Sequence, residues 1–136
     1  MKATIVIPNI NGKGWLKDSI ESVYAQTEQD FELIIVDNGS TDESLEQARS
    51  YCSRPNFTLI ENGTNTGFSH AVNQGIARAK GEYVVMFNND AFAEPNWLAE
   101  LIRIYDSVDV RFLLEDFFAK LALCYGEGTS SKGGCN

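Results

Sequence analysis

The chain has 136 residues, the common size of one domain, so a single core is expected and a second full domain is excluded. Hydrophobic residues make up 43% and charged residues 22%, which excludes a disordered chain, a fibrous repeat and a disulfide scaffold. The net charge of −8 gives no diffuse attraction to phosphate backbones, so nucleic acid is not an expected partner and an anionic ligand has to be bound locally.

The first part of the chain alternates apolar runs with amphipathic segments. Ala3 to Ile7 does not alternate in polarity and predicts a strand buried on both faces. Trp15 to Tyr24 has apolar residues at helical spacing and predicts a helix. Phe31 to Val36 predicts a second strand, and Ser40 with Glu43 forms a capping-box pattern that opens a second helix.

The same alternation continues along the chain. Phe57 to Ile60 predicts a third strand, and a helix is expected from about Ser69 to Ala79. Tyr83 to Phe87 predicts a fourth strand, and Pro95 suits the first turn of an amphipathic helix that follows. Residues 112–122 have the spacing of a further amphipathic helix, and the last residues have the composition of a flexible tail.

This order predicts an α/β fold with a mostly parallel sheet and helices on both faces. Ligands of such sheets bind beyond the carboxyl ends of the strands. Those ends are segments 8–11, 37–39, 61–67 and 88–90, and all of them are polar or rich in turn residues. We therefore expect a binding site at this edge.

Two of these segments suit a nucleotide. Asp37 ends an apolar strand, where its carboxylate could bind a base or ribose; alternatively it belongs to a helix-capping loop. Gly67 precedes a helix whose first N–H groups could hold a diphosphate, with Asn73 one turn further on; alternatively Ser69 is an ordinary cap.

Asn88-Asn89-Asp90 offers one carboxylate and two amides after a buried strand. Such hard oxygen ligands suit Mg²⁺ or Mn²⁺ already bound to phosphate oxygens; alternatively the segment is a turn with Asp90 solvated. His70, the single histidine, has no partner at metal spacing, and a surface or packing role is expected. The chain contains neither a P-loop nor a G-x-G-x-x-G motif.

Five stretches of the chain form a pattern when they are taken in order. They are A-T-I-V-I-P-N-I-N-G, F-E-L-I-I-V-D-N-G-S-T-D, N-T-G-F-S-H-A-V-N-Q-G-I, A-K-G-E-Y-V-V-M-F-N-N-D-A and E-P-N-W-L. Together they resemble the nucleotide-binding half of family 2 glycosyltransferases. The resemblance covers roughly residues 1–106 and is greatest to the rhamnosyltransferase-like branch. It implies a GT-A fold that transfers a sugar from a nucleoside diphosphate donor with inversion.

The resemblance also implies roles for individual residues. Pro8 and Asn11 would line the base pocket, and Asp37 would bind the base or ribose. Gly67 and Asn73 would lie along the nucleotide. Asp90 would be the metal-binding carboxylate of a DXD-like motif in which Asn88 replaces the first Asp, with Mg²⁺ or Mn²⁺ as cofactor.

The region after Asp106 departs from the family pattern. Residues 1–106 are interpreted as a nucleotide-sugar-binding GT-A half, and residues 107–136 as a divergent or truncated helix and tail. The family's acceptor half, with its catalytic Asp, does not fit into that length. Asp116, next to Glu115, is the one candidate base; the alternative is an exposed pair on a helix.

Two functional hypotheses follow. The first is an inverting glycosyltransferase acting on a glycan or lipid-linked acceptor in cell-surface polysaccharide or glycan synthesis. The second is an inactive truncated domain that only binds nucleotide-sugar or a partner subunit. Three cysteines without metal-ligand spacing and the lack of a signal peptide predict a cytoplasmic location, with any membrane association peripheral and at the inner face. An apolar face left by a truncated sheet would favour self-association.

Overall fold

The computed structural model describes residues 1–107, in which strands and helices alternate as the sequence predicts. The elements are β1 (Ala3–Asn9), α1 (Leu16–Tyr24), β2 (Phe31–Asp37), α2 (Ser44–Arg49), β3 (Phe57–Glu61), α3 (Phe68–Arg78), β4 (Tyr83–Met86) and α4 (Trp97–Ser107). Contacts between residues divide the chain into two compact units: Met1–Ile102 form the first, and the second begins at Arg103. The predicted helix at 112–122 lies outside the described residues. No helix of the described part has the length and apolar run needed to cross a lipid bilayer.

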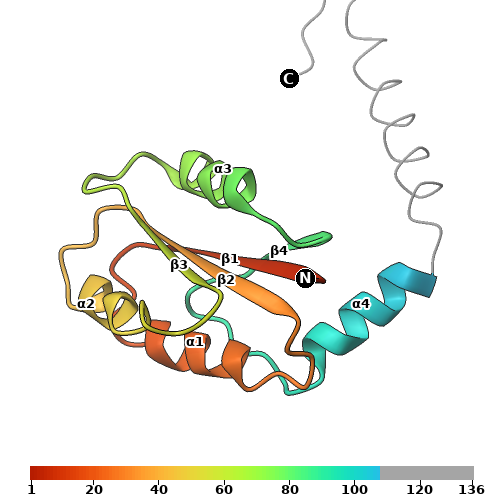
Figure 1. Ribbon diagram of the computed structural model, residues 1–136. Coiled ribbons are helices and arrows are strands. Elements are labelled where there is room, and N and C mark those ends of the chain that lie inside the picture. The colour runs from red at the N-terminus through yellow and green to blue at the C-terminus, as the bar shows by residue number, and fades with distance from the viewer. Residues whose placement is uncertain (108–136) are drawn as a thin grey trace, which may run out of the picture. The chain divides into compact units, whose positions relative to one another are not determined.

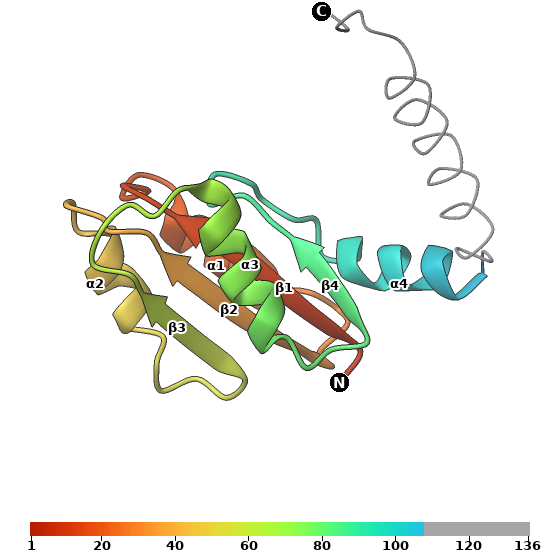
Figure 2. The same cartoon turned by 90° about the horizontal axis from the view of Figure 1, so that it is seen from above.

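The four strands form one parallel sheet in the order β3-β2-β1-β4 (Figure 2). In the register of the central pair, Ala3 lies opposite Phe31 and Asn9 lies opposite Asp37, so β1 and β2 end together. Ala3 to Ile7 are all buried, which confirms the prediction of a strand covered on both faces, and every residue of β2 is buried as well. The edge strand β4 alternates between half-buried and exposed residues.

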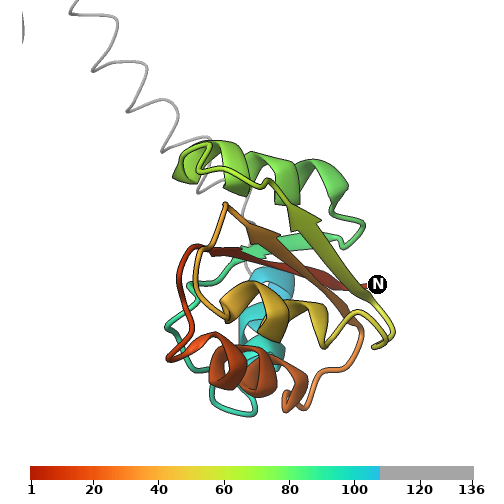
Figure 3. The ribbon, with the colours of Figure 1, turned by 90° about the vertical axis from the view of Figure 1, so that its left-hand side faces the viewer.

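Helices cover both faces of this sheet, and each face has its own apolar cluster (Figures 1 and 3). The larger cluster joins one side of the strands to α1, α2 and the start of α4. Its members include Ile5, Ile7, Leu16, Ile20, Leu33, Ile35, Ala48 and Leu98. The smaller cluster joins the other side to α3, through Val6, Ile34, Val36, Ile60 and Ala71. Figure 3 shows the resulting layers, with α3 on one side of the sheet and α1 and α2 on the other.

Small residues bring α3 close to the sheet. Gly75 is buried, and a Cβ atom at this position would overlap Cγ1 of Val6 on β1. Ala71, one turn earlier, is fully buried in the same cluster. The close packing fixes the height of α3 above the sheet, and with it the position of the helix start.

Several predicted element ends are wrong. Pro8 does not end β1, which continues to Asn9. The N–H that proline lacks would point towards β4, whose pairing with β1 ends at Val6, so no hydrogen bond is lost there. The Ser40–Glu43 capping box does not form, because the Ser40 hydroxyl donates to Asp37 and α2 begins only at Ser44.

The predicted cap of α3 is also wrong. Ser69 lies inside the helix, and Gly67 is the residue before its first turn, with φ of 90°. This left-handed backbone is accessible to glycine at no steric cost, which explains why glycine occupies the turn. No side chain accepts a hydrogen bond from the first turn of α3 at the cap position.

Candidate functional site

A pocket of about 410 Å³ lies at the carboxyl edge of the sheet, where the sequence predicts a site. It is formed by the ends of β1 and β2, the loop before α3, the start of α3 and the segment after β4. The lining residues are Pro8, Asn9, Ile10, Asn38, Asn65, Phe68, Ala71, Asn88, Asn89 and Asp90. Half of them are asparagines, and Asp90 is the one charged residue among them. The pocket is therefore rich in neutral donors and acceptors.

Asn9 connects three strand-end segments from the centre of the site. Its side chain is 1% exposed, and Nδ2 donates to Oδ1 of Asp37 at 2.9 Å and to Oγ of Ser44 at 3.0 Å. Its Oδ1 accepts from Nδ2 of Asn89 at 2.9 Å. One buried amide thus fixes the ends of β1, β2 and β4 relative to one another.

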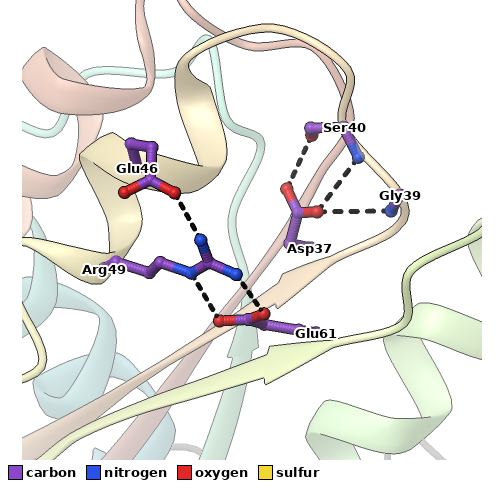
Figure 4. A network of polar contacts seen from close by, with 6 residues as sticks. All are labelled: Asp37, Gly39, Ser40, Glu46, Arg49 and Glu61. Atoms are coloured by element: carbon purple, nitrogen blue, oxygen red, sulfur yellow. Dashed lines mark hydrogen bonds and ion pairs between the residues drawn. The ribbon is translucent and has the colours of Figure 1, made fainter.

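The carboxylate of Asp37 is buried and fully occupied by hydrogen bonds (Figure 4). Oδ1 accepts from Asn9 and from the Ser40 hydroxyl at 2.6 Å. Oδ2 accepts from the backbone N–H groups of Ser40 at 3.0 Å and of Gly39 at 3.3 Å. In this structure, the Asp37 carboxylate holds the loop after β2, and it caps no helix, because α2 begins only at Ser44.

Asn38 holds the loop between β3 and α3 against the end of β2. Its Nδ2 donates to Oδ1 of Asn65 at 3.0 Å and to the carbonyl of Gly67 at 3.2 Å. Its Oδ1 accepts from the N–H of Thr66 at 3.0 Å and from the Thr66 hydroxyl at 2.8 Å. Because the loop backbone passes within 2.9 Å of a Cβ position at Gly39, a side chain there would displace it.

An ion-pair network joins α2 to the end of β3 (Figure 4). Arg49, the last residue of α2, donates from Nε to Oε1 of Glu61 at 2.9 Å and from a terminal nitrogen to Oε2 at 2.7 Å. Arg49 also contacts Glu46. The hydrogen bonds from Arg49 lower the pKa of Glu61. Since these side chains are solvent-exposed, the network contributes orientation more than stability.

The loop after β1 is held against the segment before α2. Oδ1 of Asn11 accepts from the N–H of Thr41 at 2.8 Å. Asp42 accepts from the N–H of Lys13 at 3.0 Å and from the N–H of Ser44 at 2.9 Å. Desolvation acts to raise the pKa of Asp42, but these hydrogen bonds and that of the Ser44 hydroxyl outweigh it, and the pKa is lowered.

The start of α3 presents free backbone donors near the pocket. The first intrahelical bond runs from the N–H of Ala71 to the carbonyl of Gly67. The N–H groups of Phe68, Ser69 and His70 precede it and so have no acceptor within the helix. Together with the helix dipole, they give this end a partial positive charge.

The segment after β4 contributes the only carboxylate of the pocket. Asn89 is fixed through its contact with Asn9, and the carbonyl of Asn88 accepts from Ser19 at 3.3 Å. Asp90 is exposed. Within residues 1–107, no three His, Cys, Asp or Glu side chains gather at metal-binding distance. The donor set fits Mg²⁺ or Mn²⁺ when phosphate oxygens supply the remaining ligands.

The structure brings some of the predicted site residues together. Those that line the pocket are Pro8, Asn88 and Asp90. Those that lie outside its lining are Asn11, Asp37, Gly67 and Asn73, and Asp116 lies outside the described residues. His70 is exposed on α3, as expected. Sequence reasoning missed Asn9 and Asn38, although each is a polar residue at the end of a buried strand, and that position was the available signal.

The parallel sheet with helices on both faces and the pocket beyond the carboxyl ends of its strands define the chain as an α/β domain of the GT-A type. A solved structure has a similar fold. The chain superposes on TarS of S. aureus, solved with UDP and with UDP-GlcNAc, with a TM-score of 0.72 and 25% identity. The match covers 78% of this chain and 31% to 32% of the solved TarS chain, residues 1–349. A mannosyltransferase from Pyrobaculum calidifontis, solved with GDP-Man and Mn²⁺, has a TM-score of 0.62 and 28% identity over 67% of this chain and 28% of its own.

The chain belongs to glycosyl transferase family 2, whose family model matches residues 4–112. An uncharacterized glycosyltransferase of Rickettsia typhi is 35% identical over 106 residues, which are 78% of this chain and 32% of the relative. The chain thus spans about a third of the length of this relative.

Proposed function

We propose that this chain is the donor-binding part of an inverting glycosyltransferase, which moves a sugar from a nucleoside diphosphate donor to an acceptor hydroxyl. The observation that carries the proposal is the asparagine-rich pocket beyond the carboxyl ends of β1, β2 and β4. Asn9 and Asn38 hold the surrounding loops with their amides. The side chains of Asn65, Asn88 and Asn89 supply the remaining donors and acceptors, which suit the edge of a base and a ribose. The complexes of TarS with UDP and UDP-GlcNAc support the choice of ligand.

In the proposed reaction, a carboxylate base removes the proton of the acceptor hydroxyl, and the acceptor oxygen forms a bond to the anomeric carbon. The bond between that carbon and the diphosphate oxygen breaks, and the nucleoside diphosphate leaves with the electron pair. Attack opposite the leaving group inverts the anomeric centre. Asp116 is our candidate base. Contacts of Asn11, Asp37, Gly67 and Asn73 with the nucleotide stay predictions, and none of these four residues is in the lining of the pocket.

The charge of the pocket argues that donor binding requires a divalent cation. Asp90 is negative, the diphosphate is negative, and the lining contains neither Lys nor Arg. Asp90 and Asn88 would hold Mg²⁺ or Mn²⁺ together with the phosphate oxygens. The bound ion would stabilise negative charge on the departing diphosphate. The Mn²⁺ in the mannosyltransferase complex supports this assignment.

Calorimetry of the 136-residue chain with UDP and GDP tests the proposal. Binding should be detected with Mn²⁺ and weaken with a chelator, and Asp90→Asn should lower the affinity by about tenfold or more. Asp18, an exposed carboxylate on α1, provides a matched control, and Asp18→Asn should bind as the wild type does. Asp37→Ala should also weaken binding, since it releases the loop after β2. Equal nucleotide affinity with and without Mn²⁺ would remove the metal role.

A second candidate function is a domain that binds nucleotide-sugar, or a partner subunit, without transfer. The observation that favours it is that Asp90, which we assign to the cation, is the one carboxylate lining the pocket in residues 1–107, so none is left there to act as the base. A coupled assay for released nucleoside diphosphate separates the two functions. Asp116→Asn should abolish transfer and leave donor affinity unchanged if Asp116 is the base; transfer that survives the change would eliminate it.

The wider assignments also stay predictions. They are the rhamnosyltransferase-like branch, the glycan or lipid-linked acceptor, a role in polysaccharide synthesis, self-association and a cytoplasmic location at the inner membrane face. Identification of the donor sugar and acceptor by a transfer assay with candidate substrates tests the first three.

A further inference from the structure

An exposed aromatic ring lies among the amides of the pocket. Phe68 is the first residue of α3, lines the pocket and is 65% exposed. Of the large apolar side chains exposed in residues 1–107, Phe68 and Ile10 are the two that line the pocket. An exposed phenyl ring at a polar cleft leaves apolar surface in water that a ligand could cover.

The backbone that carries Phe68 is held on both sides. Gly67 precedes it with φ of 90°, and the Gly67 carbonyl accepts from Asn38. On its C-terminal side, Ala71 and Gly75 pack α3 against the sheet. A ring on such a backbone loses little conformational freedom when a ligand binds, because its remaining freedom is that of two side-chain torsions.

We propose that Phe68 binds the nucleobase of the donor by stacking its ring on the face of the base; the inference rests on the proposed function. The diphosphate needs the cation at Asp90, so the charged end of the nucleotide is assigned to that part of the pocket. The base is the flat and least polar part of the nucleotide, and Phe68 is the one aromatic side chain among the lining residues. Stacking tolerates different bases, while the asparagines supply the hydrogen bonds that distinguish them.

Phe68→Ala tests this assignment in the 136-residue chain, with UDP, GDP, UDP-GlcNAc and inorganic pyrophosphate as probes in the presence of Mn²⁺. The variant should bind UDP and GDP about tenfold more weakly, the effect of losing one stacked ring, and pyrophosphate as the wild type does. Phe68→Tyr should restore the affinity, since it keeps the ring. Phe92→Ala is the matched control, because Phe92 is 61% exposed but does not line the pocket.

The outcomes distinguish this inference from the proposed function. If the wild type binds neither UDP nor GDP, both are overturned. If it binds them and Phe68→Ala binds equally well, only the role of Phe68 is overturned. An equal loss for pyrophosphate would indicate a disturbed helix start, and a loss confined to UDP-GlcNAc, with UDP unaffected, would place the ring against the sugar; each contradicts stacking on the base.

Discussion

Replacing Asn9 by Asp tests the centre of the site with almost no change in shape. The Asn9 amide donates to Oδ1 of Asp37 across 2.9 Å, and both side chains are 1% exposed. The substitution removes this donor and places a second carboxyl group at the same distance. The new pair must therefore either carry two like charges or take up a proton.

The two costs can be compared. Two unit charges 2.9 Å apart repel by about 6 kcal/mol at an effective dielectric constant of about 20. Keeping one carboxyl protonated at pH 7, with an ordinary pKa of about 3.9, costs about 4 kcal/mol. Protonation is the cheaper outcome, so we expect Asn9→Asp to lose about 4 kcal/mol of unfolding free energy at pH 7 and about 1 kcal/mol at pH 4.5.

Proton linkage gives the direction in which the loss of unfolding free energy in Asn9→Asp changes with pH. The folded variant holds a proton that the unfolded chain releases above pH 4 or so, so the difference from wild type grows as pH rises. Urea unfolding of both proteins at pH 4.5 and pH 7 measures it. Asn9→Ala is the control, because it removes the amide without adding charge and should cost about 2 to 3 kcal/mol at both values of pH. A deficit for Asn9→Asp that is the same at both would refute the contact between Asn9 and Asp37.

Three further predictions concern the scaffold. Gly75→Ala should lower the unfolding free energy by about 1 to 3 kcal/mol, because its Cβ would overlap Val6. Val6→Ala should lower the unfolding free energy less in that variant than in the wild type, which a double-mutant cycle of denaturation experiments would measure. Burial and the 2.6 Å hydrogen bond to Glu21 raise the pKa of Tyr51. An ultraviolet titration of Tyr51→Phe should therefore lack the last tyrosine step of the wild type. The contribution of Tyr51 to the unfolding free energy should be lost as pH rises past the ordinary tyrosine pKa of about 10. Glu32→Ala should cost about 2 kcal/mol in urea unfolding, because the Thr4 hydroxyl and the Lys80 N–H both donate to Glu32, which is 5% exposed.

Much of the fold could be predicted from the sequence because burial leaves a periodic record. The runs beginning at Ala3 and Phe31 are apolar without alternation, and both are strands of the sheet centre. The sheet order leaves no such record, since it depends on which strands pair across long separations. The capping errors at Ser40 and Ser69 have local causes that the motif does not contain. Asp37, three residues earlier, takes the Ser40 hydroxyl, and α3 begins at Phe68, which places Ser69 inside the helix.

The position of the site could be predicted, but the division of roles within it could not. The edge was predictable because parallel strands end on the same side, and Pro8, Asn88 and Asp90 do line one pocket. Whether a polar residue faces the ligand or supports the loops depends on distances that no linear spacing contains. Asp37 has the chemistry of a ligand-binding residue, yet within residues 1–107 the hydrogen bonds of its carboxylate all come from Asn9, Gly39 and Ser40.

The distribution of charge around the pocket links its architecture to the proposed dependence on a cation. Asparagine side chains fix the loops without adding net charge, so the field in the pocket comes chiefly from Asp90 and from the free N–H groups at the start of α3. These two features have opposite signs, and the partial positive charge of a helix end is smaller than that of a carboxylate. A diphosphate alone would therefore be repelled on balance, whereas a diphosphate carrying a divalent cation would be attracted to Asp90. Metal and nucleotide should accordingly bind with positive coupling, each raising the affinity for the other by the same factor.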